Sequence, residues 1–283
     1  MSDRSLPLFC DADLAARIER VERQLIEASA LAAHARKADG RGFVIPIAGG
    51  LASFADDDSP YNKVVGVGFG GVPTAAELDE VERAYAAVDA PVQVELPHLA
   101  DPDIAAVLSD RGYRLESFEN VLGLALADHY DVVVPDGIEI RPSGDDEFEV
   151  WLELMADAVA APDTQGVPWR EEFPRQTYLD AERDAATADI ARYVAIRGGV
   201  IAGGAGLRTT AEGIAQFAGA ATAPAHRRHG IQSALLSTRL ADAAAAGCKV
   251  GVITTQPASK SQQNAQRRGF DLLYTRAVLV KQP

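Results

Sequence analysis

The chain has 283 residues, of which 47% are hydrophobic and 24% charged, so it is long and apolar enough for two globular domains with separate cores. The formal net charge of −14 argues against nucleic acid as the main partner, because neutralising phosphates requires a basic surface. No segment resembles a signal peptide, and no apolar stretch approaches the roughly 18 residues of a membrane span, so we expect a soluble, cytoplasmic protein without a membrane partner.

The first half of the sequence predicts alternating helices and short strands. Apolar residues recur at three- and four-residue steps over residues 11–38, which is typical of an amphipathic helix. Thr74 with Glu77 three residues later indicates a capping box and a helix over 74–88. The other elements predicted here are strands at 43–54, 63–69, 92–96 and 113–127 and a helix at 101–111. Residues 128–135 follow as a short linker, which predicts little flexibility between the halves.

The second half repeats this plan. It starts with a strand at 138–141 and continues with helices within 145–160 and 169–186. Gly198 and Gly199 predict a tight hairpin between strands at 190–197 and 200–207. The remaining elements are a strand at 214–222, a helix at 231–246, a strand at 250–255, a helix at 259–268 and a strand at 270–280.

The order of elements and two short matches indicate a degenerate internal repeat. Residues 71–73 precede a helix as residues 222–224 do, and the triplet 111–113 corresponds to 268–270. The charges differ, because residues 1–135 carry 23 acidic and 11 basic side chains, whereas the rest of the chain carries 18 and 16. We therefore expect a site for a polyanion only in the second half. Two unrelated α/β domains are the alternative.

An anion site is predicted where the strand at 214–222 turns into the helix at 231–246. Two arginines and two histidines lie in this turn, although cations oppose the macrodipole at a helix N-terminus by a few tenths to about 1 kcal/mol each. No Ser, Thr or Asp cap stands directly before Gly230. Free helix N–H groups, the small Gly230 and the side chains of Arg227 and Arg228 suit a diphosphate. A surface helix that happens to start with arginines is the alternative.

Residues 227–232, Arg-Arg-His-Gly-Ile-Gln, resemble the Arg/Gln-x-x-Gly-x-Gly/Ala signature of the GNAT superfamily of acyl-CoA-dependent N-acyltransferases, with Gln232 in place of Gly or Ala. The small-residue strand before the turn, the Leu-rich helix after it and the Arg-x-Gly-Phe sequence at 267–270 extend the resemblance over residues 136–283. It implies an α/β fold of two tandem GNAT-like domains, each a central, mostly antiparallel sheet flanked by helices. The domains would be 1–130, a decayed copy without a cofactor site, and 136–283.

The resemblance also implies a cofactor, acetyl-CoA, with CoA as the product. Its pantetheine arm would lie between the strands at 214–222 and 250–255, where a backbone N–H would polarise the thioester carbonyl. The small side chains of the first strand suit such an arm, although they also let a helix pack closely. The cofactor-binding residues implied in this way are Ala220, Ala221, Thr222, Arg227, Arg228, His229, Gly230, Ile231, Gln232, Ser233 and Asn264.

The catalytic groups are less clearly indicated. Many family members carry a tyrosine acid four residues before the Gly-Phe pair, and this chain has Ala265 there. Tyr274 is the candidate acid, with a packing role as its alternative, and Ser261 is a weaker one. A thiolate leaves without much help, so the acid is not obligatory. Asn264 is a candidate contact of the thiol end, or a plain helix-surface amide.

Several carboxylates stay open as the general base that a neutral amine requires. They are Glu182, Glu212 and the pair at 171–172, with a solvated surface position as the alternative for each. Trp169 is a candidate for the acceptor-side wall or, equally, for a hydrophobic staple at the start of a helix. Cys10 and Cys248 are isolated and the histidines share no ligand spacing, so we expect neither a disulfide nor a metal site.

The sequence therefore predicts an N-acetyltransferase that moves acetyl from acetyl-CoA to a primary amine of a small molecule or peptide by direct attack. The expected assembly is a monomer or homodimer. A non-catalytic acyl-CoA-binding sensor or scaffold is the alternative, favoured by the missing tyrosine and the decayed first half.

Overall fold

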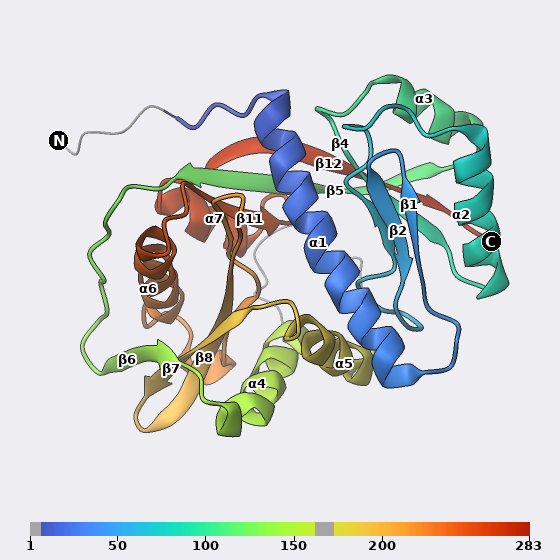
Figure 1. The fold of residues 1–283 in the computed structure, drawn as a ribbon. Coiled ribbons are helices and arrows are strands. Elements are labelled where there is room, and N and C mark those ends of the chain that lie inside the picture. The colour runs from blue at the N-terminus through green and yellow to red at the C-terminus, as the bar shows by residue number, and fades with distance from the viewer. Residues whose placement is uncertain (1–6, 162–172) are drawn as a thin grey trace.

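The computed structural model describes residues 7–161 and 173–283. They form a mixed α/β fold in which helices flank a long, mostly antiparallel sheet (Figure 1). The helices are α1 (Ala12–Lys37), α2 (Ala75–Ala87), α3 (Asp103–Asp110), α4 (Phe148–Ala160), α5 (Arg175–Ala185), α6 (Ile231–Ala245) and α7 (Lys260–Arg267). The strands are β1 (Phe43–Ile47), β2 (Gly50–Phe54), β3 (Lys63–Val65), β4 (Val92–Pro97), β5 (Arg114–Ala125), β6 (Ile138–Pro142), β7 (Ala191–Arg197), β8 (Val200–Thr209), β9 (Ile214–Gln216), β10 (Ala220–Thr222), β11 (Val250–Thr255) and β12 (Asp271–Lys281). None of the helices described is long and apolar enough to cross a membrane.

The two halves of the chain exchange their last strands. The sheet runs in the order β1-β2-β3-β4-β12-β5-β11-β9-β8-β7-β6, with β10 paired to β8. β12 therefore lies between β4 and β5, so that Ala277 is opposite Leu96 on one side and Phe118 on the other. β5, the last strand of the first half, pairs in turn with β11. The order β1-β2-β3-β4 on one side of the β12–β5 pair thus mirrors β7-β8-β9-β11 on the other.

Two more segments connect the halves. α1 packs against β2 and also against α5, where Arg36 pairs with Asp184 at 2.7 Å (Figure 1). The predicted linker has no helix or strand but is fixed to α6, because the N–H of Val133 donates to Oγ of Ser237 at 2.9 Å. The halves therefore share a sheet, a helix contact and an anchored connection.

A buried group of charges lies beneath α1 where the halves meet. Arg276 of β12 is 1% exposed and lies 2.8 Å from Glu19 of α1. Its Nη1 atom is also 3.5 Å from Glu95 and 3.4 Å from Glu119. Burial, with a smaller contribution from the Glu95 carboxylate, raises the pKa of Glu119 to about 7. The hydroxyl of Tyr274 donates to Glu19 at 2.7 Å and completes the group.

Most predicted elements are present within a few residues of their expected bounds, and the capping box of α2 is confirmed. The N–H of Glu77 donates to the Thr74 hydroxyl, and the N–H of Thr74 donates to the Glu77 carboxylate at 2.7 Å. The single strand predicted over 43–54 is wrong, because it is a hairpin that turns at Ala48 and Gly49 with φ of 44° and 82°. Gly49 and Gly50 carry the same hairpin signal as Gly198 and Gly199, but the apolar residues on both sides of them resemble one continuous strand.

The single strand predicted over 214–222 is also wrong. β9 and β10 are separated by residues 217–219, which form an irregular stretch. The N–H of Gly206 on β8 donates there to two carbonyls, Ala218 at 2.9 Å and Gly219 at 3.1 Å. The extra residue ends the regular ladder, as at a β-bulge, and lets β10 leave the direction of β9.

Candidate functional site

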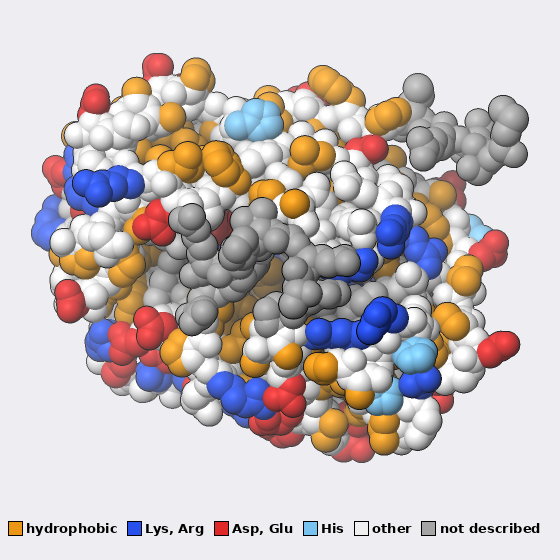
Figure 2. All heavy atoms as spheres, turned by 180° about the vertical axis from the view of Figure 1, so that it is seen from behind, with side chains coloured by type: hydrophobic (Ala, Val, Ile, Leu, Met, Phe, Trp, Pro, Cys, Tyr) orange, Lys and Arg blue, Asp and Glu red, His pale blue; other side chains and the backbone are white. Residues whose placement is uncertain are grey.

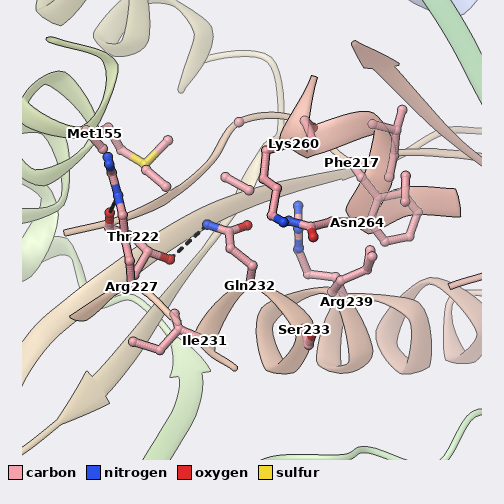
Figure 3. A pocket seen from close by; sticks show the side chains of 18 of the residues that line it. Met155, Phe217, Thr222, Arg227, Ile231, Gln232, Ser233, Arg239, Lys260 and Asn264 are labelled. Atoms are coloured by element: carbon pink, nitrogen blue, oxygen red, sulfur yellow. Dashed lines mark hydrogen bonds between the residues drawn. The ribbon is translucent and has the colours of Figure 1, made fainter. Parts of the chain in front are cut away.

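A cavity of about 590 Å³ lies where the sheet splits in the second half of the chain. β9 pairs in parallel with β11, and the N–H of Phe217 still donates to the carbonyl of Val252 at 3.0 Å. Beyond this point β10 pairs with β8, and the described residues show no pairing between β10 and β11. Residues of α4, α5, α6 and α7 complete the lining, and the close view shows their side chains around the opening (Figure 3).

The cavity is cationic although the chain is strongly acidic. None of the described residues that line it is Asp or Glu. Its cationic lining residues are Arg227, Arg228, Arg239, Lys260, Arg267 and Arg268. Lys and Arg side chains also gather on the α6 side of the face shown in Figure 2. In a protein of net charge −14, this local excess of positive charge favours an anionic ligand with several charges.

The structure brings together the residues that the sequence singled out for cofactor binding. Those that line the cavity are Ala220, Ala221, Thr222, Arg227, Arg228, Gly230, Ile231, Gln232, Ser233 and Asn264. His229 is exposed and does not line it. Ser261 also lines the cavity.

The turn before α6 leaves the helix N-terminus without a side-chain cap. Arg228 and Gly230 both have positive φ, 64° and 85°. Within residues 7–161 and 173–283, no side-chain hydrogen bond caps the first turn of α6. A Cβ on Gly230 would lie 3.0 Å from the Pro135 ring, so glycine is required here by both backbone conformation and space. The free N–H groups of this turn are available to an anion.

Gln232 departs from the signature and has its own role in the structure. Its Nε2 atom donates to the Thr222 hydroxyl at 3.0 Å and so joins the start of α6 to the end of β10 (Figure 3). Arg227 is turned towards α4, where its guanidinium donates to the carbonyl of Ala161 and, at 3.4 Å, to that of Thr222. Cations are favourable beside the last carbonyls of a helix, so Arg227 also stabilises the end of α4.

The break between β9 and β10 supplies a possible oxyanion contact. Among the described residues no hydrogen bond uses the N–H of Ala218 or Gly219, and Gly219 lines the cavity. A Cβ on Gly219 would lie 3.1 Å from the Met155 methyl, so a larger residue would crowd this position. The geometry leaves backbone donors where a carbonyl oxygen can approach.

Tyr274 does not reach the cavity, which corrects its proposed role as the acid. It is 1% exposed, and its hydroxyl is used by Glu19 in the buried charge group under α1. Burial, with the adjacent carboxylate of Glu19, raises its pKa well above the usual value. The strand bulge in the β12–β5 pairing between Leu272 and Tyr274 changes which face the following residues occupy, and no local pattern in the sequence indicates this bulge.

The residues that α4 and α5 contribute to the lining are apolar except for one tyrosine. Met155, Ala158 and Val159 of α4 and Tyr178 of α5 lie there. Tyr178 is hydrogen-bonded to Glu182 one helical turn on, and burial raises the pKa of that carboxyl while this hydrogen bond lowers it. Glu182 itself does not line the cavity.

The other open candidates are placed elsewhere. The Glu212 carboxylate accepts from Gln24 at 3.0 Å at the contact with α1, and this hydrogen bond lowers its pKa. Trp169 and the glutamates at 171–172 lie outside the described residues. No group of three or more His, Cys, Asp or Glu side chains within 7–161 and 173–283 is placed to hold a metal ion.

Sequence reasoning missed Arg239, which lies on the inner face of α6 and lines the cavity. A detectable signal existed, because this arginine stands between apolar residues, Leu235, Leu236 and Leu240, on the face that the helical period assigns to the core. An arginine on such a face has to find polar partners or a ligand.

Comparison with known proteins agrees with this geometry. The model of the acetyltransferase (GNAT) family matches residues 152–270. A GCN5-related N-acetyltransferase from Kribbella flavida is 21% identical, with a TM-score of 0.63 over 90% of this chain and 95% of the other. One from Sphaerobacter thermophilus is 15% identical, with a TM-score of 0.57 over 100% and 96%. No curated protein matches the sequence significantly.

A tandem GNAT protein from the clavulanic acid biosynthesis pathway is also similar in structure. It is 14% identical, with a TM-score of 0.61 over 82% of this chain and 78% of the other. At such identities the likeness concerns the fold. The predicted α/β fold of tandem GNAT-like domains with a mostly antiparallel sheet is confirmed.

Proposed function

We propose that the chain is an N-acetyltransferase that moves acetyl from acetyl-CoA to a primary amine of a small molecule or peptide, starting from the match of residues 152–270 to the model of the GNAT acetyltransferase family. The observation that carries the proposal is the cationic cavity at the split of the sheet, which no carboxylate of the described residues lines, next to a helix N-terminus that none of them caps. Both features suit a nucleotide diphosphate.

The residues present fit acyl-CoA. The N–H groups of Ile231, Gln232 and Ser233 would hold the diphosphate, with Arg228 and Arg268 neutralising its charge. The small residues Ala220 and Ala221 of β10 and the amide of Asn264 would accompany the pantetheine arm. These assignments give each part of an extended anionic thioester a partner in the lining.

The chemistry supplied by the acyl donor is a thioester that a neutral amine attacks. The C–N bond forms while the C–S bond breaks, the bonding pair moves to sulfur, and the amine loses a proton. The N–H of Gly219 would stabilise the negative carbonyl oxygen. The proton that the amine loses would pass through the Tyr178 hydroxyl to the Glu182 carboxylate, which would be the general base. Tyr178 lines the cavity and is hydrogen-bonded to that carboxylate.

The proposal gives the first half a structural role. In this proposal the chain comprises tandem domains at 1–130 and 136–283. The first domain is a decayed copy that completes the shared sheet without binding a cofactor. Both cysteines are free thiols, which fits the cytoplasmic location expected from the sequence. A monomer or homodimer remains the proposed assembly.

Calorimetric titration with CoA tests the site. Arg228→Gln should weaken CoA binding about tenfold or more, because it removes a charge-assisted contact. Arg114→Gln is the matched control, since Arg114 is an exposed arginine of β5 that does not line the cavity. Equal affinities for the two variants would refute the phosphate assignment. Thiol release from acetyl-CoA against a panel of primary amines then separates an enzyme from an acyl-CoA sensor, which binds without turnover.

A further inference from the structure

Arg239 is a buried arginine at the inner end of the cavity. It is 3% exposed, and its guanidinium lies over the Phe217 ring at 5.4 Å from the ring centre. Figure 3 shows its side chain rising from α6 beside Asn264. Arg239 thus belongs to the lining of the cavity and also to the hydrophobic core below the split strands.

This cation has no anionic partner among the described residues. Its Nε donates to the carbonyl of Leu235 at 3.2 Å, and its Nη1 donates to those of Gly206 at 2.7 Å and Ala218 at 3.5 Å. No salt bridge within 7–161 and 173–283 includes it. Tyr193 of β7 interacts with it electrostatically, and the hydroxyl of this tyrosine donates to Asp242 at 2.6 Å.

The arginine stays charged in spite of this environment. Burial lowers its pKa to about 10, which is still far above neutral pH. The carbonyl contacts use Nε and Nη1, whereas no described residue accepts a hydrogen bond from Nη2. A buried cation with a donor left over, on the wall of a cavity, is complementary to an anion that arrives or forms there.

The position of Arg239 matches the thioester end of the proposed acyl donor. It lies nine residues after Gly230 on α6, which at the helical rise corresponds to roughly 14 Å, comparable to an extended pantetheine arm. It also contacts the carbonyl of Ala218, next to the free N–H of Gly219. Ala265, at the position where relatives carry a tyrosine acid, lines the same cavity.

We propose that Arg239 stabilises the CoA thiolate as it leaves and so replaces a proton-donating tyrosine. The inference rests on the proposed acetyl-CoA chemistry. When the C–S bond breaks, sulfur keeps the bonding pair and becomes negative, and the guanidinium balances this charge without giving up its proton. The amine's proton goes to the base on the other side of the cavity. The same side chain would therefore favour the ionised form of CoA in the product complex.

The ionisation of bound CoA tests this directly. Ultraviolet absorbance of the thiolate is followed against pH for free CoA and for CoA bound to the wild-type protein. We expect the thiol of bound CoA to titrate about one to three pH units lower than that of free CoA, as a nearby opposite charge requires. A bound thiol that titrates at or above the free value in the wild-type protein overturns the inference, whatever the variants do.

Two variants separate charge from structure. Arg239→Gln keeps a side-chain donor for the carbonyls but should return the thiol titration to the free value, whereas Arg239→Lys should keep most of the lowering. Arg268→Gln, on another arginine of the same cavity, should weaken CoA binding and leave the thiol titration unchanged. An unchanged titration in Arg239→Gln refutes the role of Arg239. If CoA does not bind to the wild-type protein at all, the proposed function itself fails.

Discussion

The two halves of this protein differ in how the N-terminus of a corresponding helix is capped. In the first half, Glu77 lies in the first turn of α2, and its carboxylate accepts from the N–H and the hydroxyl of Thr74, each at 2.7 Å. In the second half, α6 begins after Gly230 with no side-chain cap and with arginines ahead of it. The negative group that a helix N-terminus favours is therefore built into one half and has to be supplied by a ligand in the other.

The space beside the two helices differs in the same sense. Below the turn of α2, apolar side chains such as Leu78, Ile104 and Leu108 leave a cavity of only about 10 Å³. Beside α6, the cavity measures about 590 Å³, and Ala220 and Ala221 of β10 line it. The same order of elements thus encloses a filled core in the first half and the cavity in the second. The size of a few side chains accounts for this difference.

The strongest test introduces an aspartate at one positive-φ glycine in each half. Gly230→Asp should weaken CoA binding by at least about 100-fold, because a carboxylate would face the phosphates at a backbone φ of 85° that also disfavours the substitution. Gly71→Asp carries the same substitution at a φ of 102° with no atom near the new Cβ, and it should bind CoA like the wild type. Calorimetry of both variants, with thermal unfolding as a check on folding, compares them. A similar loss of CoA affinity in both variants would mean that CoA binding is not confined to the second half.

A second test asks whether the chemistry belongs to the second half. Burial raises the pKa of Glu182, so this base is active only above that pKa and turnover should rise with pH as it ionises. Glu182→Gln should reduce turnover by about 100-fold or more and remove this rise, leaving the one due to the acceptor amine. Tyr274→Phe is the control, because that tyrosine is buried away from the cavity and should keep the wild-type rate. A wild-type rate in Glu182→Gln would exclude it as the base.

The smallest expected effect concerns the buried charges where the halves meet. The folded-state pKa of Glu119 is raised to about 7, so the folded protein holds a proton there that the unfolded chain has already lost. The contribution of this group to stability is therefore present at low pH and declines as pH rises towards about 7. Glu119→Gln should make stability less dependent on pH between about 5 and 7, measured by denaturant unfolding. An identical pH dependence of stability in both proteins would show that Glu119 has the same pKa in the folded and the unfolded state.

Much of the fold followed from local signals in the sequence. The capping box at Thr74, the glycines at 198 and 199 and the arginine-rich turn before Gly230 each carry a local physical rule, and the helices, hairpin and cavity lie where these rules place them. Local rules cannot show which strands are neighbours. The exchange of β5 and β12 depends on pairing between residues far apart in the chain, so nothing near 271–281 indicated it.

The misplaced catalytic tyrosine has the same origin. Tyr274 is a candidate from the sequence because it lies on the final strand near the position that Ala265 leaves empty, but β12 carries it into the sheet between the halves, where its hydroxyl donates to Glu19 of α1. Glu19 is distant in sequence and belongs to the other half. Arg239 was missed for a related reason. Its place in the lining of the cavity depends on the separation of β10 from β11, which the sequence around α6 does not indicate.

The exchanged strands also govern the order in which this chain can fold during synthesis. β4 of the first half pairs with β3 on one side but lacks its other neighbour until residues 271–281 have left the ribosome, and β5 lacks a partner on either side until β11 and β12 are made. The first half therefore keeps open strand edges while the second half is synthesised, a state prone to incorrect pairing. Its acidic composition, 23 acidic against 11 basic side chains over residues 1–135, keeps neighbouring nascent chains apart by charge repulsion during that delay.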